Sequence, residues 1–123
     1  MSVVADPIRV LVVEDSEDQS DLLRAYFEKA GCHVETETTA EAAIAAYQDW
    51  TPELAVIDLV LPGMDGWELV TRMKAEIPDC AIAVTSVLDE RRYPPGTASL
   101  PKPFTRAQLL AVLKSSVPRW SAG

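Results

Sequence analysis

The stretch LAVIDLVLPGMDG, residues 54–66, places an acidic side chain between a strand and a turn. Its first part, Leu54–Ile57, is a continuous apolar run of the length expected for a strand buried on both faces, and Asp58 ends that run. A Pro-Gly pair and a second glycine then predict a turn that leads into a helix. A carboxylate in this setting is a positioned functional group, because an ordinary solvated acid needs no buried strand before it.

Strand-like runs recur on both sides of this stretch, and helix-like patterns lie between them. The expected strands are Ile8–Val13, His33–Glu37, Leu54–Asp58, Ala81–Thr85 and Ala98–Leu100. The expected helices follow Ser16 as far as Gly31, run over Ala42–Tyr47 and Trp67–Ile77, and follow Thr105 through Leu113. Five strand–helix units in alternation predict an α/β fold, a doubly wound, five-stranded, mostly parallel sheet in a flavodoxin-like three-layer sandwich.

Three of the expected helices begin with a capping-box signature, in which a Ser or Thr precedes a Glu or Gln by three positions. The pairs are Ser16 with Gln19, Thr38 with Glu41, and Thr105 with Gln108.

Length and composition restrict the class of protein. A chain of 123 residues, 48% hydrophobic and 24% charged, suits a single domain over residues 1–123 with a core of about 8–117. The net charge of −8 disfavours nucleic acid and anionic membranes as partners, because phosphate groups would be repelled. The apolar runs near the start are far shorter than a signal or membrane segment, and we expect a cytoplasmic protein. We expect Cys32 and Cys80 to be reduced thiols and His33 to be a solvated strand-end residue.

Polar side chains gather at the predicted carboxyl ends of four strands. Glu14 and Asp15 follow the first strand, Asp58 ends the third, Thr85 ends the fourth, and Lys102 follows the last. In doubly wound sheets, ligands bind at this edge, near the point where the strand order reverses. The fold would therefore bring these residues together, although they lie far apart in the sequence.

The three acids predict a metal site. Glu14, Asp15 and Asp58 offer hard oxygen ligands, too few for a protein-only cage but suited to a Mg²⁺ that keeps several waters. Without a metal, two unit charges about 4 Å apart repel by on the order of 4 kcal/mol at an effective dielectric of about 20. A site that keeps such an unfavourable repulsion between its side chains is often a functional site.

Lys102 and Thr85 complement an anion rather than the metal. The prolines on either side of Lys102 restrict the backbone, so its ammonium is aimed with little entropy left to lose, and a cis bond to Pro103 is plausible. Thr85 can donate a hydroxyl hydrogen bond to the same anion. A carboxylate nucleophile, Mg²⁺, a hydroxyl donor and a lysine are the parts needed to form an aspartyl phosphate.

This combination resembles the receiver domains of two-component response regulators, which have the CheY-like fold. The matching stretches are Val12-Val13-Glu14-Asp15, DLVLPGMDG from Asp58 to Gly66, Thr85-Ser86 and Lys102-Pro103-Phe104. The resemblance spans nearly the whole chain, from Ile8 to about Val117, and its motifs are specific in combination and in order.

The resemblance implies how the acids act. Asp58 would accept a phosphoryl group from a histidine kinase or a histidine phosphotransfer protein. Glu14 and Asp15 would hold Mg²⁺ together with Asp58 and the backbone carbonyl of Val60. Such a protein is not an enzyme in turnover: it catalyses only its own phosphorylation and dephosphorylation, and it switches contacts with a downstream protein.

The resemblance also implies roles for four further residues. Thr85 would be the switch hydroxyl, and Lys102 would form an ion pair with the phosphoryl group. Gly66 would permit the turn after the site, and Asp65 would cap the helix that follows.

Two departures from the family pattern concern how a signal leaves the site. The position three before the lysine, usually Tyr or Phe, is Ser99, which is too small to act as a bulky rotamer switch. The segment Ser86–Pro101 is short, and Pro94-Pro95-Gly96 interrupts it. We therefore expect a short, irregular or mobile fourth helix, and we hypothesise that phosphorylation orders or shifts this segment.

Two other classes of protein fit the sequence less well. A phosphatase that uses an aspartyl phosphate in turnover would need a second acid where Val60 stands. A flavodoxin-like cofactor site would need phosphate donors where the acidic run Glu14–Asp18 stands. A pseudo-receiver docking module and a receiver fragment of a longer response regulator stay open as alternatives, although the tail from Val117 favours a stand-alone receiver.

Overall fold

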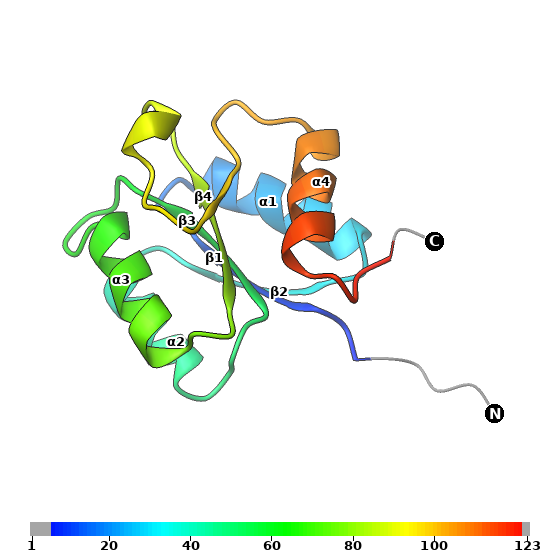
Figure 1. The fold of residues 1–123 in the computed structure, drawn as a ribbon, viewed down its shortest axis with the longest axis horizontal. Helices are drawn as coiled ribbons and strands as arrows, with labels where there is room; N and C mark the ends of the chain where they lie inside the picture. Colours follow the sequence, from blue (N-terminus) through cyan, green and yellow to red (C-terminus); the bar gives the residue numbers. More distant parts are fainter. Residues whose placement is uncertain (1–5, 122–123) are drawn as a thin grey trace.

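The computed structural model describes residues 6–121, and its strands form one parallel sheet (Figure 1). The strands are β1 (Arg9–Val13), β2 (His33–Glu37), β3 (Leu54–Asp58), β4 (Ala81–Thr85) and β5 (Ala98–Ser99). Their order is β2-β1-β3-β4-β5, and each neighbouring pair is parallel. This confirms the doubly wound, five-stranded sheet predicted from the sequence, and the strand order reverses between β1 and β3.

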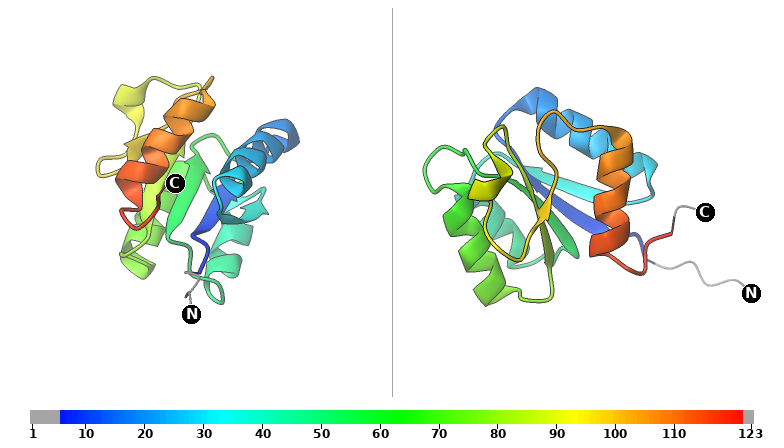
Figure 2. Two further views of the ribbon diagram at one scale, coloured as in Figure 1. Left: turned by 90° about the vertical axis from the view of Figure 1, so that its right-hand side faces the viewer. Right: turned by 45° about the horizontal axis from the view of Figure 1, so that its top comes forward.

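In the described part of the chain, four α-helices cover the two faces of the sheet (Figure 2). They are α1 (Glu17–Lys29), α2 (Ala40–Tyr47), α3 (Gly66–Glu76) and α4 (Arg106–Ser116). The helices α1 and α4 pack on one face, and α2 and α3 pack on the other, so the sheet separates two apolar cores. Within residues 6–121, no helix has both the length and the hydrophobicity needed to cross a membrane.

The interior strand β1 contributes side chains to both cores. Successive side chains of a strand point to opposite faces of the sheet. Val10 and Val12 belong to the core under α1 and α4, whereas Leu11 and Val13 belong to the core under α2 and α3. A run that is apolar at every position therefore marks a strand covered on both faces, as predicted.

Three of the helices begin at the N-cap residue that the sequence predicted. Ser16 caps α1, Asp65 caps α3, and Thr105 caps α4 in a full capping box with Gln108. The helix bounds differ from the predicted ones by a few residues, and α4 continues past Leu113 to its end at Ser116.

The cap of α2 differs from the prediction. Thr39 caps this helix, and its hydroxyl accepts the N–H of Ala42 at 3.0 Å. The predicted pair of Thr38 with Glu41 is therefore wrong by one residue. Glu41 does not close a capping box: its carboxylate accepts the N–H of Met64, in the turn that follows β3.

The connection between β4 and β5 contains no α-helix. Residues 86–97, here named the strap, form loops and one 3₁₀ turn, η1 (Glu90–Arg92). The expected five strand–helix units are therefore four, and a short, irregular segment stands in the fourth position. The interruption predicted at Pro94-Pro95-Gly96 is present, and Gly96 adopts a φ of 74°.

Candidate functional site

The predicted site residues meet at the carboxyl edge of the sheet. Asp58 and Thr85 are partners in the register of β3 with β4, so they lie side by side. Glu14 and Asp15 follow β1, which pairs with β3 on its other side. Lys102 follows β5 and reaches across β4 to the acids. The convergence inferred from strand ends is thus present in the structure.

Three carboxylates form a compact acidic cluster. One oxygen from each of Glu14, Asp15 and Asp58 lies within 4.8 Å of the others. Glu14 and Asp58 are buried, at 1% and 5% exposure, whereas Asp15 is exposed. Three hard oxygen donors at this spacing, with one side open to solvent, fit a divalent cation such as Mg²⁺ that retains some of its waters.

The ammonium of Lys102 bridges the two buried acids. Its Nζ lies 2.5 Å from Glu14 Oε1 and 3.0 Å from Asp58 Oδ2. Burial raises the pKa of Glu14, and the hydrogen bond from Lys102 offsets this only in part. Burial lowers the pKa of Lys102, but the hydrogen bonds to both carboxylates outweigh it and raise that pKa overall. The position of Lys102 in the sequence indicated an anionic ligand but did not indicate its role as counterion of the acids.

Backbone N–H groups complete the binding of the buried carboxylates. Val60 donates to Asp58 Oδ1 at 3.0 Å, and Ser16 donates to Glu14 Oε2 at 3.1 Å. Each carboxylate thus has one oxygen on an N–H group and the other on Lys102. This fixes the orientation of both side chains before any ligand arrives. The Lys102–Pro103 bond is cis, as the sequence suggested.

The hydroxyl of Thr85 is the exception in this site. Its oxygen is buried, and no hydrogen-bond partner for it exists among residues 6–121. An unsatisfied buried hydroxyl costs on the order of 1–3 kcal/mol, and most buried polar groups avoid that cost. An acceptor bound at the neighbouring Asp58 would supply the missing partner.

Two glycines shape the turn after β3 for different reasons. Gly63 has a φ of 73°, a conformation that side-chain-bearing residues rarely adopt. Gly66 instead allows close packing, because a Cβ there would lie 2.4 Å from the carbonyl oxygen of Asp58 and 2.5 Å from Cα of Leu59. The turn predicted at Gly66 is correct, but the physical reason is the close approach of α3 to the strand end.

Tyr93 and Glu41 contact the site region without any sequence motif that predicted it. The hydroxyl of Tyr93 donates to the carbonyl of Ser86, the residue after Thr85, at 3.0 Å. Glu41 reaches from α2 to the N–H of Met64 at 3.3 Å. Both contacts arise from tertiary packing between segments that lie apart in the sequence.

The remaining reactive side chains lie away from this edge. His33 begins β2, is exposed, and lies beside Trp50 with ring centres 5.5 Å apart. Cys32 and Cys80 are free and buried, and burial raises their pKa values to about 11 and about 12. Both thiols are therefore protonated at neutral pH, as expected of structural cysteines.

Comparisons with known proteins agree with this geometry. A profile of the family described as "Response regulator receiver domain" matches residues 10–114. The transcriptional regulatory protein PrrA of Mycobacterium tuberculosis is 30% identical over 117 residues, which cover 90% of this chain and 50% of PrrA. Protein PilG of Pseudomonas aeruginosa is 25% identical over 129 residues, which cover 98% of this chain and 96% of PilG.

Among solved structures, the chemotaxis response regulator CheY4 of Vibrio cholerae matches with a TM-score of 0.84 and 23% identity. The match covers 91% of this chain and 100% of CheY4, and at this identity it concerns the fold alone. The chain spans half the length of PrrA and a smaller share of some other curated relatives. Those relatives contain further regions, and their whole-protein activities are not carried over to this chain.

Proposed function

Because this chain belongs to the response regulator receiver family of two-component systems, we propose that it accepts a phosphoryl group on Asp58 and switches protein contacts in response. The donor is the phosphohistidine of a histidine kinase or of a histidine phosphotransfer protein. Residues 1–123 act as one receiver domain in this proposal.

The arrangement around Asp58 carries the proposal. Asp58 is the acid that joins all three features of the site: it belongs to the acidic cluster, bonds to Lys102, and pairs with Thr85 in the sheet. The unpartnered hydroxyl of Thr85 beside it supports an anionic group as the missing acceptor. Glu14 shares the first two features but does not neighbour Thr85 in the sheet register.

In the proposed reaction, a carboxylate oxygen of Asp58 attacks the phosphorus atom of the phosphohistidine. A P–O bond forms, the P–N bond breaks, and its electron pair remains on the imidazole nitrogen of the donor. The ammonium of Lys102 neutralises charge on the transferred group, and the hydroxyl of Thr85 donates to one of its oxygens. Attack by water later releases inorganic phosphate and restores the carboxylate.

The metal proposed for this site is Mg²⁺. Glu14, Asp15, Asp58 and the backbone carbonyl of Val60 would hold it, and the compact acidic cluster supports this set of ligands. When bound, Mg²⁺ supplies positive charge to the phosphoryl oxygens and to the acids that hold it. The three carboxylates and Lys102 bind and orient the reacting groups.

The proposed role is regulatory, with catalysis confined to the domain's own phosphorylation and dephosphorylation. The output is a contact with a downstream protein, in the cytoplasm. The net charge of −8 supports protein partners over nucleic acid or an anionic membrane.

Labelling with a small phosphodonor tests the proposal. Acetyl phosphate with Mg²⁺ should add one phosphoryl group, labile to acid and to base, that intact-mass spectrometry detects. Asp58→Asn should abolish the label, whereas Asp65→Asn, which preserves the cap of α3, should label as the wild type does. Undiminished labelling of Asp58→Asn would overturn the assignment. A wild-type protein that takes no label would favour the docking-module alternative.

A further inference from the structure

The strap is joined to the phosphoryl site by one backbone carbonyl. The carbonyl oxygen of Ser86 accepts the backbone N–H of Lys102 at 2.9 Å and the hydroxyl of Tyr93 at 3.0 Å. Ser86 directly follows Thr85, whose hydroxyl is buried and unpartnered within residues 6–121. One acceptor thus connects the backbone of the lysine, the end of β4 and a side chain from the far part of the strap.

Two residues of α3, Trp67 and Lys74, hold the strap on this helix, away from this carbonyl. The indole N–H of Trp67, in the first turn of α3, donates to the carbonyl of Arg92 at 2.8 Å. The guanidinium of Arg92 lies 5.6 Å from the centre of the same indole ring. The ammonium of Lys74 donates to the carbonyl of Pro95. The strap therefore has fixed attachments on α3, in addition to the one attachment at the site.

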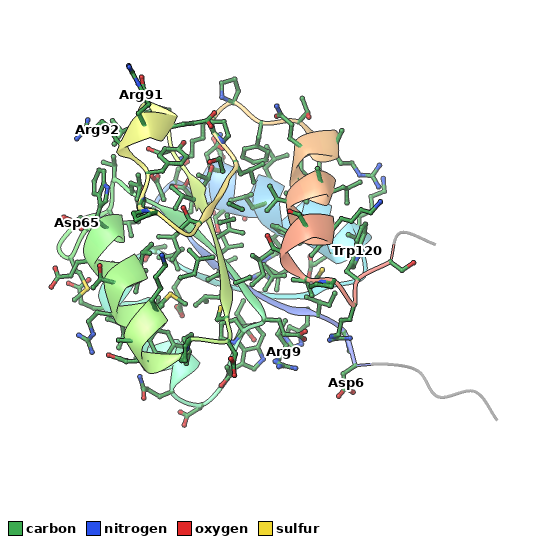
Figure 3. The ribbon with its side chains drawn as sticks, in the orientation of Figure 1. Asp6, Arg9, Asp65, Arg91, Arg92 and Trp120 are labelled. Carbon is green, nitrogen blue, oxygen red and sulfur yellow. The ribbon has the colours of Figure 1, made fainter. Side chains whose placement is uncertain are left out.

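Parts of the strap face solvent and are accessible to a partner protein. Val87 is 77% exposed and does not anchor the strap. The side chain of Arg91 is 90% exposed, and Figure 3 shows it at the outer edge of the molecule, pointing away from the body. Tyr93 and Leu88 instead pack against the core under α2 and α3. A shift of the strap would change an exposed surface while its inner side chains stay in contact with the core.

We propose that Tyr93 is a positioning residue that couples the phosphoryl site to the strap, an inference that rests on the proposed function of Asp58. When Thr85 moves to donate to a phosphoryl oxygen, the adjacent carbonyl of Ser86 moves with it. That movement changes the hydrogen bond from Tyr93. The part of the strap between this bond and the contact of Arg92 with Trp67 then changes its conformation.

This coupling comes from the strap itself and not from β5. Position 99 in β5 carries an exposed serine, too short to fill a cavity or to reach far along the sheet. Tyr93 has the length and the hydroxyl to reach Ser86, and it is half-buried, which limits its alternative positions. It is the side chain that both belongs to the strap and bonds to the residue next to Thr85.

Amide hydrogen exchange of the strap tests the proposal, with beryllium fluoride and Mg²⁺ as the phosphoryl mimic. In the wild type, the mimic should change exchange across residues 86–97. Tyr93→Phe removes only the hydroxyl, so exchange in the free protein should rise by roughly five-fold, the effect of losing one neutral hydrogen bond. The mimic should still bind Tyr93→Phe, seen as a raised melting temperature, but the strap should no longer respond to it.

Two further variants separate the role of Tyr93 from general loosening. Tyr47→Phe loses a hydroxyl bond of similar length, 2.7 Å to Glu76 between α2 and α3, and should keep the full strap response. Trp67→Phe loses the bond to Arg92, so it should raise exchange in the free strap and yet keep the response to the mimic.

The outcomes distinguish the coupling through Tyr93 from the proposed function of Asp58. A wild-type response in Tyr93→Phe, or an unresponsive strap in a wild-type protein that binds the mimic, would overturn the coupling and leave the function of Asp58 intact. A wild-type protein that the mimic does not stabilise at all would overturn the proposed function and the coupling together.

Discussion

Gly66 packs directly against the backbone of Asp58. A methyl group on Gly66 would lie 2.4 Å from the Asp58 carbonyl oxygen, far inside van der Waals contact. Backbone atoms in a buried strand end cannot move aside as a flexible side chain can. The first turn of α3 is therefore held against the candidate phosphoacceptor by the absence of a side chain.

Gly66→Ala should lower the free energy of unfolding by about 3 kcal/mol, because the clash is with buried backbone. Gly31→Ala is the matched control: its φ is +91°, but a Cβ there meets nothing within 4 Å among the described residues. That variant should lose only about 1–2 kcal/mol from the left-handed backbone conformation. Urea unfolding measures both, and equal losses would contradict the packing argument.

Thr85→Val should leave the unphosphorylated protein equally stable or about 1 kcal/mol more stable. The change replaces an unsatisfied buried hydroxyl by a methyl group of nearly the same shape. The same change should weaken stabilisation by beryllium fluoride. Thr39→Val removes a hydroxyl that caps α2 and should cost about 1 kcal/mol. A large destabilisation by Thr85→Val would show that its hydroxyl already has a partner.

Lys102→Met should destabilise the metal-free protein by about 3 kcal/mol, since it leaves two buried carboxylates without their counterion. Mg²⁺ should then stabilise the variant more than it stabilises the wild type, because the metal becomes the main compensating charge. Thermal melts over a Mg²⁺ titration measure both effects. Lys114→Met, at an exposed position on α4, should change neither.

Asp15→Asn should weaken Mg²⁺ binding and slightly stabilise the metal-free protein. The stabilisation should stay below about 1 kcal/mol, because Asp15 is exposed and its repulsion is screened by solvent. Asp18→Asn changes the same charge outside the cluster and should not alter the Mg²⁺ midpoint in a melting series. Identical Mg²⁺ midpoints for the wild type and Asp15→Asn would argue against the metal site.

Stability should fall between pH 8 and pH 10 because of the two buried thiols. The unfolded chain loses these protons near an ordinary thiol pKa of about 9, whereas burial raises the folded pKa values to about 11 for Cys32 and about 12 for Cys80. The native state therefore holds more protons in this window, and unfolding becomes easier as pH rises, by on the order of 2 kcal/mol. The double variant Cys32→Ala, Cys80→Ala should show a clearly smaller loss in urea unfolding at the two pH values.

The sheet was predictable because its signals are local. The strands β3 (Leu54–Asp58) and β4 (Ala81–Thr85) have the predicted bounds, because a short run that is apolar up to its last residue is typical of a strand covered on both faces. The acids and Lys102 were found for the same reason, as they stand at strand ends that a parallel sheet must bring together. These inferences need only the alternation of apolar strands with helices and the parallel direction of the strands.

The contacts made across the fold were not predictable. The bond of Tyr93 to Ser86 depends on the irregular course of the strap, and the bond of Met64 to Glu41 depends on how α2 lies beside the turn that follows β3. The counterion role of Lys102 was missed because a charged residue at a strand end is first interpreted as a contact for a bound ligand. An ion pair with neighbouring side chains of the protein itself is the less obvious interpretation. The error at Thr38 has a simpler cause: two adjacent threonines offer nearly equal caps, and only tertiary packing decides between them.

The division of the interior by the sheet has a consequence for how this domain can change over evolutionary time. Side chains such as Phe27 and Met73 belong to separate apolar clusters on opposite sides of the sheet. A change of volume in one core therefore needs compensation only within that core, because distant sites contribute to stability almost independently. The residues of each core can therefore be substituted independently of the other core. The carboxyl edge of the strands is the place where substitutions on the two faces must remain compatible.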